Sequence, residues 1–128
     1  MSDIIRRINY AVQDQFAPEE GSSFSTGYDN YDCREPFNEW DAFYRALKDG
    51  VVRLDDVGLA KLADADVEDK DYYNEGEIWF VFTLARDGAF DAHYRRDGYY
   101  SSYEGREFDG ATVQVVGKQF IGTKWEKV

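Results

Sequence analysis

Carboxylates in one acidic segment come closest to a recognisable chemistry. They occupy positions 1, 3, 5 and 12 of a twelve-residue stretch, which supply oxygen ligands in a calcium loop: Asp64, Asp66, Glu68 and Glu75. The sixth position needs glycine for its sharp turn but holds Asp69, and a strand-like run replaces the helix that should follow. We therefore interpret the segment as a charge-rich connection, with weak calcium binding as the alternative.

A second possible chemistry is nucleophilic catalysis, which requires a nucleophile and a base held side by side. The chain has one cysteine, Cys33, and one histidine, His93, which are far apart in the sequence. We expect Cys33 to be a small, partly buried residue and His93 to be a strand position. The sequence contains no glycine-rich phosphate loop, no Cys/His metal constellation and no Gly-x-Ser-x-Gly elbow. We expect a binding protein without cofactor or metal, and not an enzyme.

The net charge of −11 comes from one part of the chain. The segment from Asp14 to Glu77 contains 18 of the 26 acidic residues and 6 of the 15 basic ones, for a net charge of −12. The segments on either side of it are nearly balanced. A surface of one sign attracts a partner of opposite sign, and nucleic-acid binders present clustered Lys and Arg instead. We expect a protein partner with a basic surface and no direct binding to nucleic acid.

Tyrosine is the second abundant residue that suits a binding surface, with ten in the chain. Its ring supplies contact area at modest entropic cost, and its hydroxyl keeps a polar tip. The alternative is ordinary packing within a sheet. We predict a contact loop from Tyr99 to Tyr103, and we expect partner contacts from five tyrosines: Tyr72, Tyr73, Tyr99, Tyr100 and Tyr103.

Composition and length restrict the class of protein. The chain has 128 residues, 43% hydrophobic and 17% aromatic, which predicts a single globular domain despite the charge. One cysteine excludes an intramolecular disulfide and favours a reducing compartment. The sequence has neither a basic-then-apolar leader nor an apolar run of about 20 residues, so we expect a cytoplasmic protein with no membrane association.

Apolar residues recur at three- and four-residue intervals in the first half of the chain. They predict one helix from about Asp3 to Phe16 and a second that opens within Glu35–Trp40 and ends at Gly50. The second carries an apolar stripe that includes Phe37. A third, shorter helix is predicted from Asp55 or Asp56 through Ala63, although glycine at position 58 destabilises it by about 1 kcal/mol. A solvated connection is expected from there to residue 76.

The second half of the chain has strand signals. Glu77–Leu84 is a continuous β-branched and aromatic run that predicts a central strand. A turn at Arg86–Ala89 and alternating residues in Phe90–Arg95 complete a hairpin. Asp97–Gly98 predicts a further turn, and Thr112–Val116 a further strand.

These elements predict an α+β fold in two layers, with N-terminal helices packed on a C-terminal antiparallel β-sheet. The tail is expected to pack back on the domain through Phe120, Ile121 and Trp125.

The hairpin resembles a known family. The pattern consists of a tryptophan-led strand, then Asp-Gly-x-Phe, and then a strand that ends in an aromatic residue. These features are Trp79, Asp87–Asp91 and Tyr94 in this chain. The pattern is similar to the C-terminal half of YezG-like immunity proteins. The preceding helix with Trp40 and Leu47 lies in a compatible order. The family consists of small cytosolic bacterial proteins that neutralise secreted toxins. The resemblance therefore implies obstruction of a toxin, without catalytic residues.

The resemblance covers Phe37 to Asp97. The chain departs from the family pattern at Arg95–Arg96, where the family tends to be acidic, and before Asp32, where the match is poor.

The leading functional hypothesis is an inhibitor or immunity-type module whose acidic face docks on a basic partner such as a toxin or nuclease. The alternatives are a phage-type nucleic-acid mimic acting against restriction or CRISPR enzymes, a structural or assembly subunit, and an enzyme acting through carboxylates or tyrosine. The sheet is expected to be scaffold. The contacts are expected from Asp55, Asp56, Asp64, Asp66, Glu68, Asp69 and Asp71, together with the five tyrosines named above.

Overall fold

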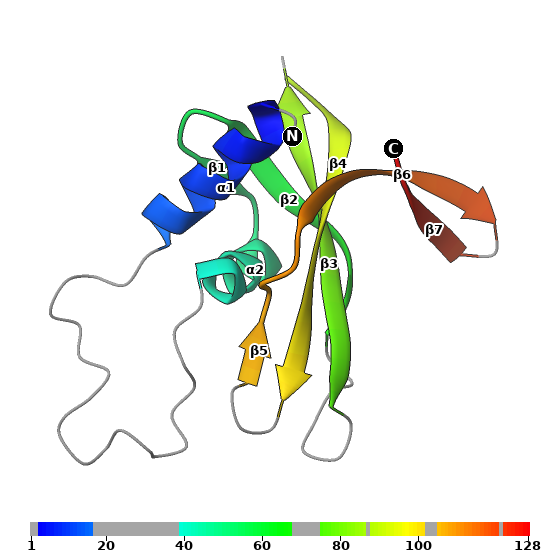
Figure 1. The fold of residues 1–128 in the computed structure, drawn as a ribbon. Coiled ribbons are helices and arrows are strands. Elements are labelled where there is room, and N and C mark those ends of the chain that lie inside the picture. Colours follow the sequence, from blue (N-terminus) through cyan, green and yellow to red (C-terminus); the bar gives the residue numbers. More distant parts are fainter. Residues whose placement is uncertain (1–2, 17–38, 68–74, 87, 102–104, 121) are drawn as a thin grey trace, which may run out of the picture.

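The computed structural model describes residues 3–16, 39–67, 75–86, 88–101, 105–120 and 122–128. In these ranges two helices precede seven strands, and the helices lie on one face of the sheet (Figure 1). The predicted α+β class, with N-terminal helices on an antiparallel sheet, is confirmed. The elements are α1 (Asp3–Gln15), α2 (Glu39–Asp49), β1 (Val52–Leu54), β2 (Gly58–Asp66), β3 (Gly76–Arg86), β4 (Ala89–Ser101), β5 (Gly105–Glu107), β6 (Thr112–Phe120) and β7 (Gly122–Lys127).

The sheet is antiparallel throughout, with strand order β1-β2-β3-β4-β6-β7, and β5 pairs with the end of β4. β3 lies inside the sheet between β2 and β4, which confirms the predicted central strand. The predicted hairpin is also confirmed, because β3 and β4 pair along their length, from Gly76 opposite Tyr100 to Arg86 opposite Ala89. Neither helix in the described ranges is long and apolar enough to cross a membrane.

The helices form where the apolar spacing predicts them. α1 buries Ile8 and Val12 completely, and α2 buries Phe43, Tyr44 and Leu47. The α2 helix ends at Asp49, directly before the predicted stop at Gly50, whose amide donates to the carbonyl of Leu47 at 3.2 Å. The segment before Glu39, including Phe37, lies outside the described residues.

The core lies between the helices and one face of β3. Alternate residues of β3, Phe80 and Phe82 among them, face the helices and are fully buried. The Phe43 ring lies 5.2 Å from that of Phe82, and Phe80 lies 4.9 Å from Phe108, both in edge-to-face geometry. Such pairs are each worth about 0.5–1.5 kcal/mol beyond the buried area, so the aromatic residues couple both layers.

The predicted third helix is wrong. The residues from Asp55 to Ala63 form a turn and most of β2. Asp56 has φ +66° and Gly58 has φ +133°, which a right-handed helix cannot contain. The register of β2 shifts between Leu62 and Asp64 through a β-bulge. Leu62 and Ala65, which are three positions apart, therefore lie on the same face of the strand and pack against the core. The expected connection from Asp64 begins later, because β2 continues to Asp66 and Val67 is buried.

The predicted turn at Asp97–Gly98 is also wrong, because both residues lie within β4. A Cβ at Gly98 would lie 2.2 Å from the carbonyl oxygen of Glu107 and 2.6 Å from the Cα of Phe108. Glycine is required there by close backbone packing, not by a reversal of the chain. β4 consequently runs on to Ser101, so the predicted contact loop begins as a strand, while Tyr103 lies outside the described residues.

The other face of the sheet is partly covered by the end of the chain. We call it the helix-free face, because neither α1 nor α2, the helices of the described residues, lies on it. Val81, Thr83 and Val115 are buried on this face. Trp125 of β7 packs against the ring of His93 at 5.1 Å, and its Nε1 donates to Asp64 Oδ2 of β2 at 2.9 Å. The tail therefore packs back through Trp125, as predicted. The strand predicted at Thr112–Val116 is confirmed and continues to Phe120 in β6, while Ile121 lies outside the described residues.

Candidate partner-binding surfaces

A cleft of about 310 Å³ lies between α1 and the turn that joins β1 to β2. We call it the α1–turn cleft. It contains two of the predicted contact residues, Asp55 and Asp56. Its lining comes from two segments about 40 positions apart in the sequence: Arg7, Tyr10, Ala11, Asp14, Gln15, Asp55 and Asp56.

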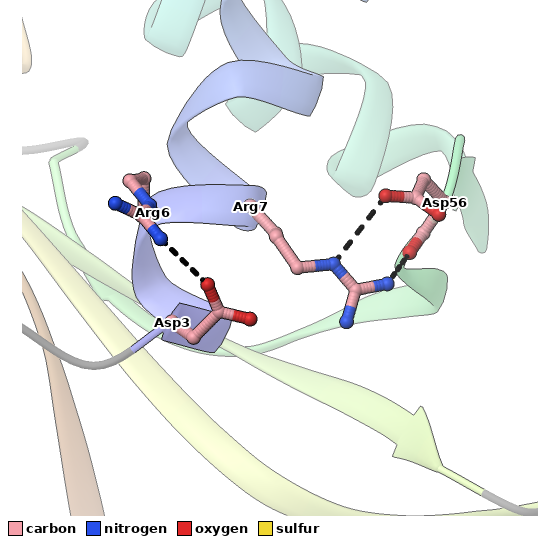
Figure 2. Close-up of polar contacts among 4 residues, drawn as sticks. All are labelled: Asp3, Arg6, Arg7 and Asp56. Atoms are coloured by element: carbon pink, nitrogen blue, oxygen red, sulfur yellow. Dashed lines mark hydrogen bonds and ion pairs between the residues drawn. The ribbon is translucent and has the colours of Figure 1, made fainter.

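Hydrogen bonds from α1 hold the turn in place. The side chain of Gln15 donates to the carbonyl of Arg53 at 2.6 Å and accepts from the amide of Asp55 at 3.0 Å. At the other end of the cleft, Arg7 Nε donates to Asp56 Oδ2 at 3.3 Å, and its guanidinium also donates to the Asp56 carbonyl (Figure 2). The left-handed conformation of Asp56 is therefore supported by contacts with α1.

The electrostatics of this cleft are acidic. Three carboxylates face one guanidinium, and Arg7 is paired with Asp56. Within the described ranges, neither Asp14 nor Asp55 makes an ion pair. Beside them the Tyr10 side chain is 60% exposed. Free carboxylate oxygens next to an exposed aromatic face are the groups that bind a Lys or Arg side chain.

Figure 2 also shows a second ion pair on α1. Arg6 donates to Asp3 at 2.8 Å, and this hydrogen bond raises the pKa of Arg6 above its ordinary value. Both side chains are exposed and outside the cleft. The pair therefore leaves the cleft carboxylates available.

The other acidic candidates of β2 lie elsewhere. Asp64 pairs with Val81 and Asp66 with Trp79, so both side chains face the helix-free side of the sheet. Asp64 is half-buried and accepts the hydrogen bond from Trp125, which gives it a structural role. The described ranges contain no group of three or more His, Cys, Asp or Glu side chains placed to hold a metal ion. Asp64 and Asp66 thus lie in an extended strand and not in a coordinating loop.

The two candidate tyrosines of β4 separate by strand alternation. Tyr99 lies on the helix-free face opposite Glu77 and is 51% exposed. Tyr100 lies on the helix side and packs against the core. Of these two tyrosines, Tyr99 therefore offers the more accessible ring. Outside the described residues lie the remaining candidates, Glu68, Asp69, Asp71, Tyr72, Tyr73 and Tyr103, and also Cys33.

Sequence reasoning missed the α1 half of the cleft. Arg7, Tyr10 and Asp14 belong to the polar side of a helix whose apolar side was recognised. Their spacing of three and four residues places them on one face of a helix, so this signal was present. Their proximity to Asp55 was not, because it depends on how α1 packs beside β1.

The consecutive arginines of β4 serve opposite faces. Arg96 faces the helices, and its guanidinium lies 4.2 Å from the centre of the Trp40 ring. Its Nε donates to the Phe108 carbonyl at 2.6 Å, and a terminal nitrogen donates to the Thr112 hydroxyl at 3.1 Å. Burial lowers the pKa of Arg96 to about 10. Arg95 lies on the helix-free face, 4.7 Å from the centre of the Trp79 ring. Arg96 is thus a packing residue, whereas Arg95 contributes to a surface.

Comparisons with protein-family models, with curated proteins and with solved structures found no match.

Proposed function

We propose that this chain is a small acidic binding protein of the inhibitor or immunity type, which docks on a basic partner in the cytoplasm. We expect the partner to be a toxin or a nuclease, because the active site of an enzyme that acts on phosphates is itself basic. The observation that carries the proposal is the α1–turn cleft. There Asp14 and Asp55 converge beside the exposed ring of Tyr10.

The cleft suits an inserted Lys or Arg side chain. An exposed ion pair contributes about 0.2–1 kcal/mol, and a cation over an exposed aromatic ring about 0.5–1 kcal/mol. One basic side chain that contacts Asp14, Asp55 and Tyr10 would therefore gain about 1–3 kcal/mol. Such a gain gives the cleft a measurable share of the affinity without making it the whole interface.

The net charge of −11 supports the same role through the rate of association. A strongly negative protein is steered toward a basic surface, and this steering weakens as salt screens the charges. The similarity of the hairpin to YezG-like immunity proteins points in the same direction. Steering by the whole chain and capture in the cleft make separable contributions to binding.

The test uses the products of genes adjacent to this one, with basic toxins and nucleases first. Association is measured by biolayer interferometry with the wild type, Asp14→Lys, Asp55→Lys and a control, Asp91→Lys, which makes the same charge change at an exposed position of β4. Reversing one charge removes an attraction and adds a repulsion of similar size, so we expect about two- to thirtyfold weaker binding for each cleft variant and a smaller loss for the control than for either of them. Equal losses in all three variants would mean that only net charge matters, and the cleft would be rejected as the docking site.

A further inference from the structure

A second candidate surface lies on the helix-free face and has cationic side chains at its centre. A hollow of about 230 Å³ on this face is lined by Arg95, Asp97, Val113, Val115, Trp125 and Lys127. We call it the Trp125 hollow. Two cations and one carboxylate line it, so it is locally basic in a protein of net charge −11. This inversion of sign indicates a ligand different from that of the α1–turn cleft.

The two cations are placed by the register of the strands. Arg95 of β4 lies opposite Val113 of β6, and Val115 of β6 lies opposite Lys127 of β7. The valines therefore form an apolar floor between the cations, and the half-buried indole of Trp125 stands beside it. An anion bound between Arg95 and Lys127 would have apolar surface directly beneath its carbon atoms.

Arg95 is held ready for such a contact. Its Nε donates to Asp97 Oδ1 at 2.7 Å, and its guanidinium is stacked over Trp79. Asp97 therefore orients the guanidinium by one edge. In the part of the chain that the structure describes, the terminal nitrogens of Arg95 make no hydrogen bond. They are the donors that bind a carboxylate in bidentate geometry.

The shape favours a segment of a protein over a small molecule. A second hollow, of about 220 Å³, shares Arg95 and Asp97 with the first and extends to the carboxylate of Glu77 on β3, so the excess of positive charge is confined to the Trp125 hollow. Together they cross the strands from β3 to β7, three steps of about 4.8 Å, which matches roughly four residues of an extended peptide. Small-molecule sites are usually single concave pockets of about 300–1,000 Å³ that enclose most of their ligand.

We propose that the Trp125 hollow binds an acidic side chain of a partner protein, with the carboxylate between Arg95 and Lys127 and a neighbouring apolar residue over Val113, Val115 and Trp125. This inference does not depend on the α1–turn cleft, since the cleft would receive a basic side chain on a different surface. The two surfaces together would let one partner be recognised by charges of both signs.

The test titrates the full chain with a blocked peptide, acetyl-Ser-Leu-Glu-Leu-Ser-amide, and with its Gln counterpart. NMR follows the indole N–H of Trp125 and the amides of Val113 and Val115. We expect shifts of these signals with the Glu peptide and binding at least about threefold weaker with the Gln peptide. Equal binding of both peptides, or shifts confined to other residues, would overturn the proposal.

Two variants and one small acid complete the test. Arg95→Gln and Lys127→Gln should each weaken the Glu peptide about two- to fivefold, and the exposed position of Lys127 keeps its variant folded. The matched control is Lys124→Gln, on the same strand but the opposite face, which should change binding less than about 1.5-fold. If isovalerate, a small branched carboxylic acid, bound as tightly as the peptide, the result would favour a free small acid and not a partner protein as the occupant of the Trp125 hollow. Undiminished binding by Lys127→Gln would exclude the hollow.

Discussion

The contact between Trp125 and Asp64 joins the last strand to the second one across the helix-free face. The indole Nε1 donates to a carboxylate oxygen at 2.9 Å, and both residues are half-buried. A hydrogen bond to a charged group is worth about 1.5–3 kcal/mol, and partial exposure to solvent places this one near 1–2 kcal/mol. Trp125→Phe also loses about 20–40 Å² of buried apolar surface, or roughly 0.5–1 kcal/mol. The variant should therefore be less stable by about 1.5–3 kcal/mol.

A double-mutant cycle with Asp64→Ala isolates the hydrogen bond. Urea unfolding of the four proteins should give a coupling free energy of about 1–2 kcal/mol between Trp125→Phe and Asp64→Ala. The bond between Asp64 and the amide of Ala65 is lost in both backgrounds and cancels. Trp79→Phe is the matched control, because Trp79 lies on the same face but stacks on Arg95, and its coupling to Asp64→Ala should stay below about 0.5 kcal/mol. A coupling below about 0.3 kcal/mol for Trp125 would refute the idea that this bond holds the last strand in place.

Three further perturbations test the layers separately. Gly98→Ala should lower the free energy of unfolding in urea by more than about 2 kcal/mol, because its Cβ would collide with the backbone of Glu107 and Phe108. A loss under about 0.5 kcal/mol would show that β5 moves aside at little energetic cost. Tyr100→Ala should lower the free energy of unfolding by about 1–3 kcal/mol, whereas Tyr99→Ala should change it by less than about 0.5 kcal/mol. If thermal unfolding showed the Tyr99 variant to be the less stable one, the assignment of the two faces would be contradicted. Arg96→Met should cost about 2–4 kcal/mol at pH 7 through the lost hydrogen bonds to Phe108 and Thr112. Burial holds the folded pKa of Arg96 at about 10, below its ordinary value, so the unfolded state binds more protons than the folded state as the pH rises above about 10. The stability of the wild type relative to Arg96→Met should therefore rise with pH in that range, and a fall would contradict the burial of the cation.

The helices and the central hairpin could be predicted because their signals are local. The spacing of Ile8 and Val12 in α1, and the β-branched and aromatic run of β3, follow directly from which face of each element is buried. The errors arose where a contact with another strand decides the local conformation. Gly58 and Gly98 look like a helix weakness and a turn in the sequence, but Gly58 lies against the backbone of Ala85 on β3, and Gly98 lies against the backbone of Glu107 and Phe108.

The candidate surfaces divide in the same way. Composition alone located the acidic segment from Asp14 to Glu77. Eight of its eighteen acidic residues lie outside the described ranges. Among the others, Asp55 meets Asp14 in the α1–turn cleft, whereas Asp64 is engaged by Trp125 on the helix-free face. The Trp125 hollow had no counterpart in the sequence reasoning, because it combines residues of three strands.

Sign of charge, helix periodicity and strand composition are properties of neighbouring residues, so the chain carries them before it folds. Which carboxylates stay accessible, which tyrosine faces solvent and which arginine serves the core depend on register and on the packing of α1 beside β1. A shift of one residue along a strand exchanges its faces, as Arg95 and Arg96 show. The binding surfaces therefore exist only once the sheet is paired, because each is made of side chains that long-range contacts bring together.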